Sequence, residues 1–170
     1  MNYSIIFSSI TGNTEILAER IKVVMHGELI YFGEPTSIIP DSDIIFIGFW
    51  TNRGTCNEDI TEYLTKLKNK KLFLFGTAGF GLDKNYFEHI LDNVKSNIDK
   101  SNTIIDTFMC RGKMQLSVRE KYERLKESDN PPENIDMLIA NFDETLLHPN
   151  ADDLVELTDK ILALKEYKLD

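Results

Sequence analysis

The 170-residue sequence has few residues of the kinds that bind metals or form disulfides, and basic side chains are scarcer than acidic ones. Its two cysteines and three histidines show no common metal-ligand spacing: Cys56, Cys110, His26, His89 and His148. We therefore expect free thiols and neither a disulfide nor a metal site. Lysine and arginine together number 19 against 28 aspartates and glutamates, which gives a net charge of −9. This balance argues against nucleic acids and anionic membranes as partners, because their phosphates would be repelled.

Long apolar runs are also lacking, and no stretch approaches the length that a membrane-spanning helix needs. The first four residues lead straight into an apolar strand, without the basic region and cleavage site of a signal peptide. These features predict a cytoplasmic protein that does not associate with a membrane. The length suits one domain over residues 1–170. We expect a monomer whose acidic surface suits a partner with a basic docking face.

The chain is organised around a hydroxyl-rich segment at residues 9–14, Ser-Ile-Thr-Gly-Asn-Thr. An apolar run precedes it and an amphipathic run follows it as far as Val24, so the pattern predicts a strand, a loop and a helix. A helix N-terminus offers unpaired N–H groups and the positive end of the helix dipole, while Gly12 allows close approach of the backbone. The segment therefore predicts a phosphate site, with a helix cap that binds no ligand as the alternative.

The type of phosphate ligand follows from what this segment contains. It lacks the lysine of the ATP/GTP loop and the three spaced glycines of the dinucleotide fingerprint. It resembles the [ST]-x-T-G-x-T signature of the flavodoxin family, which holds the phosphate of FMN with hydroxyls and backbone amides. The resemblance covers Asn2–Cys110 and the final helix. Four further segments resemble a shorter subfamily of flavodoxin-like proteins, one member of which accompanies a bilirubin reductase in gut bacteria: Gly48–Trp50, Arg53–Thr55, Cys110–Lys113 and His148–Pro149.

Apolar and amphipathic runs alternate along most of the chain. They predict strands at Tyr3–Ser8, Glu28–Phe32, Ile44–Phe49, Leu72–Phe75 and Thr103–Cys110. Helices are expected over Thr14–Met25, after Asn57, around the apolar positions Phe87–Ile98, and after Asn150. The third strand is apolar on both faces, so it should lie inside the sheet with helices on either side. The pattern indicates an α/β fold with a doubly wound, five-stranded parallel sheet. The resemblance implies that it is a flavodoxin-like doubly wound sandwich with the strand order 2-1-3-4-5.

Residues 111–149 break this alternation. We expect two short helices there, Ser117–Lys126 and Asn134–Phe142, separated by a polar segment with Pro131 and Pro132. The region is long for a connection within a compact domain. It is therefore either a functional or partner-binding addition, or a cover for the sheet edge with no further role.

Three predicted loops, after strands one, three and four, lie at the carboxyl edge of the sheet, where ligands bind in open α/β folds. In flavodoxins these loops supply the phosphate site and both sides of the isoalloxazine ring. The resemblance therefore implies that this chain binds FMN non-covalently. The implied FMN-binding residues are Ser9, Ile10, Thr11, Gly12, Asn13, Thr14, Trp50, Thr51, Asn52, Arg53, Gly54, Thr55, Thr77, Ala78, Gly79 and Phe80.

The chain departs from the usual flavodoxin pattern around the ring. Trp50 comes one residue before the usual stacking aromatic, so it either covers the flavin or fills a strand end, and Phe80 is the candidate stacker from the third loop. Gly54 resembles the glycine whose peptide can flip so that its carbonyl accepts a hydrogen bond from reduced flavin N5, although it could be a plain turn glycine. Arg53 would place a cation near the ring, which should raise the reduction potential.

The resemblance implies an electron-transfer protein that passes electrons from FMN to a redox partner. The alternative is an FMN-dependent NAD(P)H or quinone oxidoreductase, in which residues 111–149 could hold a substrate. No Ser-His-Asp set or carboxylate pair supports a separate catalytic role, and Asp83, Glu88 and Asp92 are interpreted as solvated helix faces. A receiver domain is disfavoured because Ser8-Ser9 and Trp50-Thr51 stand where it needs acidic residues.

Overall fold

The computed structural model describes residues 1–81 and 84–164, and its centre is a parallel sheet. Five strands follow one another across this sheet in the order β2-β1-β3-β5-β6, which confirms the predicted topology. A sixth strand, β4, pairs with β3 and runs antiparallel to it. The strands are β1 (Asn2–Phe7), β2 (Glu28–Gly33), β3 (Ile44–Asn52), β4 (Thr55–Cys56), β5 (Lys71–Ala78) and β6 (Thr103–Arg111).

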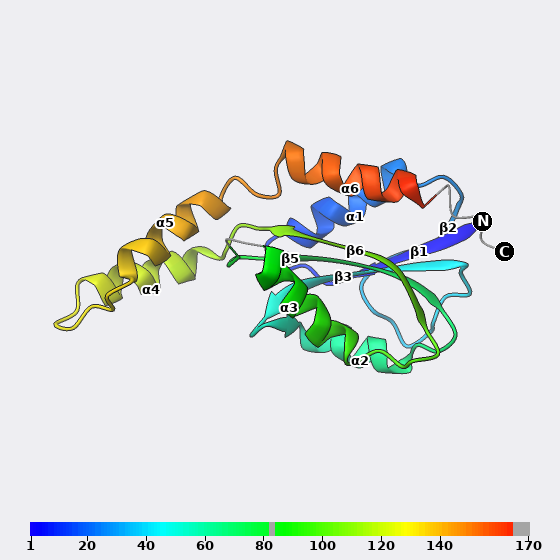
Figure 1. The fold of residues 1–170 in the computed structure, drawn as a ribbon, viewed down its shortest axis with the longest axis horizontal. Helices are drawn as coiled ribbons and strands as arrows, with labels where there is room; N and C mark the ends of the chain where they lie inside the picture. The colour runs from blue at the N-terminus through cyan, green and yellow to red at the C-terminus, as the bar shows by residue number, and fades with distance from the viewer. Residues whose placement is uncertain (82–83, 165–170) are drawn as a thin grey trace.

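Helices cover both faces of the sheet (Figure 1). The helices α1 (Asn13–Val24) and α6 (Ala151–Ala163) lie on one face, and α2 (Glu58–Lys66) and α3 (Lys84–Lys95) lie on the other. Alternate strand residues serve the two layers, because successive strand side chains point to opposite faces. Phe46 and Phe73 pack on the α1/α6 side, whereas Ile47 and Leu74 pack on the α2/α3 side. This two-sided burial explains the continuous apolar runs in β3 and β5.

Two of the central strands are longer than the sequence pattern predicted. A loop was expected over residues 50–56, but β3 continues to Asn52 and turns into β4 through Arg53 and Gly54, whose φ angles are 51° and 81°. Two positive φ values in a two-residue connection are typical of the tight hairpin turn that suits twisted strands. A loop was also expected from Gly76, but β5 runs on to Ala78 and pairs with β3 and β6.

A helical extension joins β6 to α6. Its helices are α4 (Leu116–Lys126) and α5 (Ile135–Thr145), which pack against each other and project from the sheet as an arm (Figure 1). The two helices predicted for residues 111–149 are therefore present, with α5 three residues longer at its C-terminal end. We call residues 111–118, where the chain leaves β6 and enters α4, the arm root. The assignment of residues 1–170 to one domain stays a prediction.

Within residues 1–81 and 84–164, no helix has both the length and the apolar character needed to cross a membrane. The same residues contain no group of three or more His, Cys, Asp or Glu side chains arranged to hold a metal ion. Asp83, which was interpreted as part of a solvated helix face, and positions 165–170 of the expected domain lie outside the described residues.

Candidate functional site

A cavity of about 380 Å³ lies at the carboxyl ends of the central strands. Its volume is within the range of about 300–1,000 Å³ that is usual for ligand pockets. The carboxyl edge of an open α/β sheet is also where such folds bind ligands. The residues that line the cavity are Ile10, Thr11, Trp50, Thr51, Thr77, Gly79, Lys113, Met114, Gln115 and Val118.

Six of these residues were predicted from the sequence, and the strand order explains why they meet. Ile10 and Thr11 follow β1, Trp50 and Thr51 end β3, and Thr77 and Gly79 come from the end of β5 and the residue after it. The side-chain hydroxyl of Thr51 donates to the Thr77 carbonyl at 2.9 Å, which fixes the two strand ends together. The three predicted loops therefore contribute to a single cavity.

The start of α1 has the features of an anion site. Gly12 precedes the helix with a φ of 84°, and a Cβ atom added there would meet nothing within 4 Å. The hydroxyl of Ser9 accepts a hydrogen bond from the backbone N–H of Glu15 at 3.3 Å. In the described part of the chain, the backbone N–H groups of residues 10–14 have no protein acceptor. Open space beside unpaired N–H groups at a helix N-terminus fits a phosphate.

Two residues of the same segment hold it in place. The hydroxyl of Thr14 donates to the Phe49 carbonyl at 3.2 Å and lies 3.3 Å from the hydroxyl of Thr77. The amide nitrogen of Asn13 donates to the Lys113 carbonyl at 2.9 Å. Both side chains are buried, and among the described residues the oxygen Oδ1 of Asn13 has no hydrogen-bond partner. A buried acceptor without a partner is costly, and a ligand hydroxyl could satisfy it.

Other predicted site residues lie outside the lining of this cavity. Asn52, Arg53 and Thr55 line a separate hollow on the β3–β4 hairpin, where the Arg53 side chain is exposed. The carbonyl of Gly54 accepts a hydrogen bond at 2.8 Å from the Asn93 side chain on α3. Phe80 is half-buried but does not contribute to the lining. The proposed roles of Arg53, Gly54 and Phe80 toward the ring therefore stay predictions, and the geometry gives them no support.

Ala78, the remaining residue predicted from the third loop, has a structural contact. Its carbonyl accepts a hydrogen bond at 3.0 Å from the backbone N–H of Gly112 in the arm root. A Cβ on Gly112 would lie only 2.4 Å from Nδ2 of Asn13, so this position needs a glycine for the close approach. Ala78 and Gly112 thus bring the arm root against both the third loop and the start of α1.

Four cavity residues come from the arm root and were not among the site residues predicted from the sequence. They are Lys113, Met114, Gln115 and Val118. They follow β6, which neighbours β5 in the sheet, so the arm root reaches the same edge as the three predicted loops. Cys110–Lys113 had been noted only as part of the subfamily resemblance. A local pattern could not reveal their position, because it depends on contacts such as Asn13–Lys113 between residues far apart in the chain.

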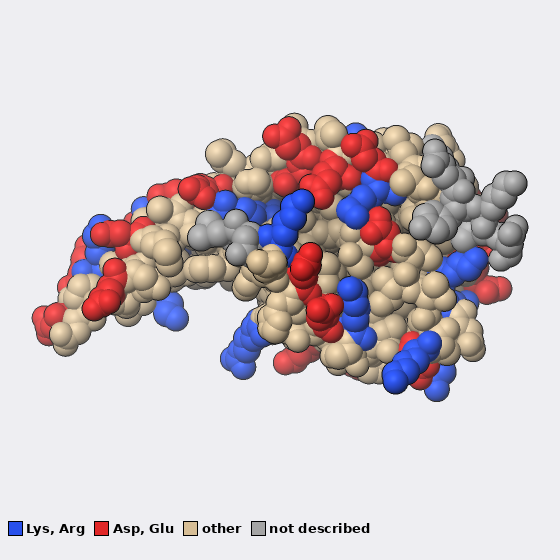
Figure 2. Space-filling model, viewed as in Figure 1, with Lys and Arg blue, Asp and Glu red and all other residues tan. Residues whose placement is uncertain are grey.

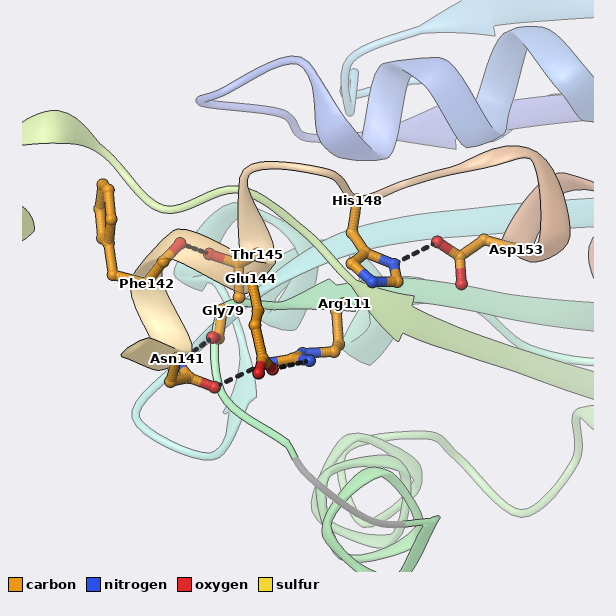
Figure 3. A network of polar contacts seen from close by, with 8 residues as sticks. All are labelled: Gly79, Arg111, Asn141, Phe142, Glu144, Thr145, His148 and Asp153. Atoms are coloured by element: carbon orange, nitrogen blue, oxygen red, sulfur yellow. Dashed lines mark hydrogen bonds and ion pairs between the residues drawn. The ribbon is translucent and has the colours of Figure 1, made fainter. Parts of the chain in front are cut away.

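A polar network ties the C-terminal half of α5, where the arm returns to the body, to the third loop (Figure 3). The buried side chain of Asn141 donates from Nδ2 to the Gly79 carbonyl at 3.0 Å and accepts from Arg111 at 2.7 Å. Arg111 also forms an ion pair with Glu144 at 3.0 Å. Arg111 therefore positions the Asn141 side chain, and Asn141 in turn holds the Gly79 carbonyl beside the cavity.

Figure 3 also shows His148, whose Nδ1 lies 2.6 Å from a carboxylate oxygen of Asp153. Both residues line a second cavity of about 400 Å³ along β6, together with Cys110. A thiol near a histidine–aspartate pair can be a nucleophile, but burial, followed by the charges of Asp153 and Glu156, raises the pKa of Cys110 well above its usual value. Because the thiolate is the reactive form, this environment opposes nucleophilic catalysis.

The sheet order, the cavity at its carboxyl edge and the hydroxyl-rich segment before α1 define a flavodoxin-type α/β protein. The flavodoxin domain family matches residues 4–161, and the chain belongs to this family. It is 33% identical to the flavodoxin-like domain-containing protein BilS of Clostridium symbiosum, over 91% of this chain and 90% of the relative. It is also 29% identical to BilS of Clostridioides difficile, over 92% of each chain.

The fold is also similar to solved flavodoxin structures. Flavodoxin 2 from Bacillus cereus, solved in its oxidised form, superimposes with a TM-score of 0.56 over 98% of this chain and 99% of that one, at 18% identity. A flavoprotein from Lactobacillus acidophilus, solved in complex with FMN, gives a TM-score of 0.50 over 64% of this chain and 92% of that one, at 17% identity. At these identities the likeness concerns the fold alone.

Proposed function

We propose that this chain binds FMN in the cavity at the carboxyl edge of the sheet and carries electrons to a partner protein. The observation that carries the proposal is the open space at Gly12 beside the unpaired N–H groups of residues 10–14, which adjoins a cavity of about 380 Å³ lined by Ile10 and Thr11. The family membership agrees with a flavin as the ligand.

The residues present fit FMN by their chemistry. The backbone amides of residues 10–14 and the hydroxyl of Thr11 would hold the phosphate, because a helix N-terminus and hydroxyl donors suit a dianion. The unpaired Oδ1 of Asn13 could accept a hydrogen bond from a ribityl hydroxyl. Trp50 would border the ring from the end of β3, where it is half-buried in the cavity wall. Bound FMN supplies the redox chemistry, while these residues bind and orient it.

The surface charge supports a partner with a basic docking face. Figure 2 shows acidic side chains gathered over α6, whose exposed carboxylates are Asp152, Glu156 and Asp159. The chain as a whole carries a net charge of −9. An acidic surface accelerates encounter with a basic partner and loses this effect as salt screens the charges.

Flavin binding is tested by titrating the purified protein with FMN and with riboflavin, which lacks the phosphate, and following the visible spectrum and the flavin fluorescence. Thr11→Val removes one hydroxyl at nearly constant volume and should weaken FMN binding by about tenfold or more, since hydrogen bonds to charged groups contribute about 1.5–3 kcal/mol. Riboflavin affinity should stay unchanged. Thr65→Val on α2 is the matched control, because its hydroxyl bonds only the Glu62 carbonyl. Absence of FMN binding to the unmodified protein would refute the proposal.

Electron transfer is tested with protein loaded with FMN and reduced by dithionite, mixed with a basic haem protein such as cytochrome c. The rate should fall as salt is added. The alternative, an FMN-dependent NAD(P)H or quinone oxidoreductase, would instead consume NADH or NADPH with a quinone in the absence of any partner protein. That result would replace the carrier assignment by a reductase.

A further inference from the structure

The three predicted loops enclose only part of the cavity. Trp50 is the only aromatic side chain in its lining among the described residues, and it comes from the end of β3. β5 lies between β3 and β6 in the sheet. The arm root, which follows β6, therefore approaches the end of β5 from the side away from Trp50. Its two apolar side chains in the lining are Met114 and Val118.

Met114 packs directly on the backbone of the third loop. A Cβ added at Gly79 would lie 2.3 Å from Cγ and 2.9 Å from Sδ of Met114, so no larger residue fits at Gly79 while this side chain stays in place. Gly79 has an ordinary backbone conformation, and its φ is not among the positive values. Position 79 therefore needs a glycine because the Met114 side chain fills the space that a Cβ would occupy.

The arm root is held in this position from three directions. The Lys113 carbonyl accepts a hydrogen bond from the Asn13 side chain. The backbone N–H of Gly112 donates to the Ala78 carbonyl. The backbone N–H of Lys113 donates to the His148 carbonyl at 3.2 Å, just after the arm returns. Asn141 of α5 bonds Gly79. The arm root is thus fastened both to the start of α1 and to the loop after β5, which are expected to hold the phosphate and one side of the isoalloxazine ring.

We propose that the arm root is the second wall of the flavin site, with Met114 and Val118 in contact with the isoalloxazine ring of the bound cofactor. This inference rests on the proposed function. A thioether is polarizable and packs favourably against aromatic rings, so Met114 suits a flat conjugated ligand. Lys113 places a positive charge in the same wall, where the sequence had suggested Arg53. The arm root, which follows β6, is therefore part of the cofactor site.

The test compares two methionine-to-alanine variants on the same arm. Met114→Ala should weaken FMN and riboflavin by the same factor, about tenfold, because the lost contact is with the ring and not with the phosphate. Met137→Ala is the matched control, since Met137 is 49% exposed on α5 and does not line the cavity. Equal affinities of Met114→Ala and Met137→Ala for both flavins would overturn the inference while leaving the proposed function intact.

A second measurement needs no variant. Hydrogen exchange on the unmodified protein, with and without saturating FMN, should show slower exchange in residues 113–118 and no change in residues 126–136 at the far end of the arm. If exchange is unchanged in residues 113–118 and slows only in residues 9–14, the inference that the arm root contacts the flavin is also overturned. Failure of the unmodified protein to bind either flavin would refute both the proposed function and this inference. That outcome can be told apart from the two results above, in which the unmodified protein still binds flavin.

Discussion

The α/β body and the α4–α5 arm are stabilised in different ways. In the body, strands β1 and β5 are almost wholly buried, as is β3 from Ile44 to Phe49. Two clusters of apolar side chains fill the layers on either side of the sheet. In the arm, α4 has no buried residue and α5 buries four, two of which are polar. The arm is instead linked by ion pairs and hydrogen bonds, such as Arg119–Asp143, Lys126–Asp136 and Asn141–Gly79.

The difference indicates that the two regions contribute to function in different ways. Apolar burial of the body supplies most of the free energy of folding, so its side chains are fixed by packing. The arm contributes little apolar burial, yet its root supplies four of the ten residues that line the cavity. Changes in the body should therefore alter stability first, and changes near the arm root should alter ligand binding first.

The largest expected effect is in the core of the body. Phe73 is fully buried in β5, with its ring centroid 5.3 Å from that of Phe46. Phe73→Ala should lower the free energy of unfolding by about 3–5 kcal/mol, because it removes buried apolar contacts and leaves a cavity. Urea denaturation measures the change. Leu147→Ala, at a side chain that is 74% exposed beside the arm, should change it by less than about 0.5 kcal/mol. Similar losses in both variants would contradict the comparison.

A pH effect is expected next, again in the body. Burial, and secondarily the neighbouring Tyr31, raises the pKa of Tyr63 from 10.0 to about 12. The folded state thus favours the neutral phenol, and this stabilisation is complete below about pH 10 and lost as the pH rises through about 12. Stability should fall by up to about 1.4 kcal/mol per pH unit in that window. Tyr63→Phe should flatten the decline relative to the unmodified protein. Its effect near pH 7 should be small because the Tyr63 hydroxyl has no hydrogen-bond partner in residues 1–81 and 84–164.

These contrasts explain what the sequence could and could not predict. The strands and helices follow from local sequence patterns, such as the continuous apolar run of β3 and the helical periodicity of α3. The strand order was implied by the family resemblance. The ends of β3 and β5 were placed too early because glycine and polar residues were interpreted as loop signals. In the structure, Gly76 lies within β5. A glycine is needed there because a Cβ would come within 2.5 Å of the Phe49 ring. Close packing, and not a turn, explains this glycine.

The sequence predicted the part of the cavity that is built from the ends of the central strands. Ile10, Thr11, Trp50, Thr51, Thr77 and Gly79 follow strands whose order could be inferred, so their meeting could be expected. The contribution of Met114 depends on hydrogen bonds that join distant parts of the chain, such as Asn13 to Lys113. No periodicity encodes such a contact. Predicting it would have required knowing where the arm leaves the sheet.

The link between arm and body can be tested with two chemically matched variants. Asn141→Asp and Asn93→Asp each remove an amide N–H that donates to a glycine carbonyl, that of Gly79 and that of Gly54 respectively. Each should cost about 1–3 kcal/mol of unfolding free energy, since a carbonyl loses its donor. Only Asn141→Asp should also weaken FMN, by about threefold or more, because Gly79 lines the cavity and Gly54 does not. The opposite pattern would assign the flavin contact to the β3–β4 hairpin in place of the arm.

The smallest effect is expected at the far end of the arm. Lys126 and Asp136 form an ion pair at 2.7 Å between α4 and α5, and both side chains are more than half exposed. Lys126→Ala should change the free energy of unfolding by no more than about 0.5 kcal/mol, because solvent and salt screen exposed pairs. FMN affinity should be unaltered, since neither residue reaches the cavity. Calorimetry and flavin titration measure the two quantities. A loss of FMN affinity in this variant would mean that the whole arm, and not only its root, controls the site, and would thereby remove the distinction between an anchored root and a solvent-exposed tip.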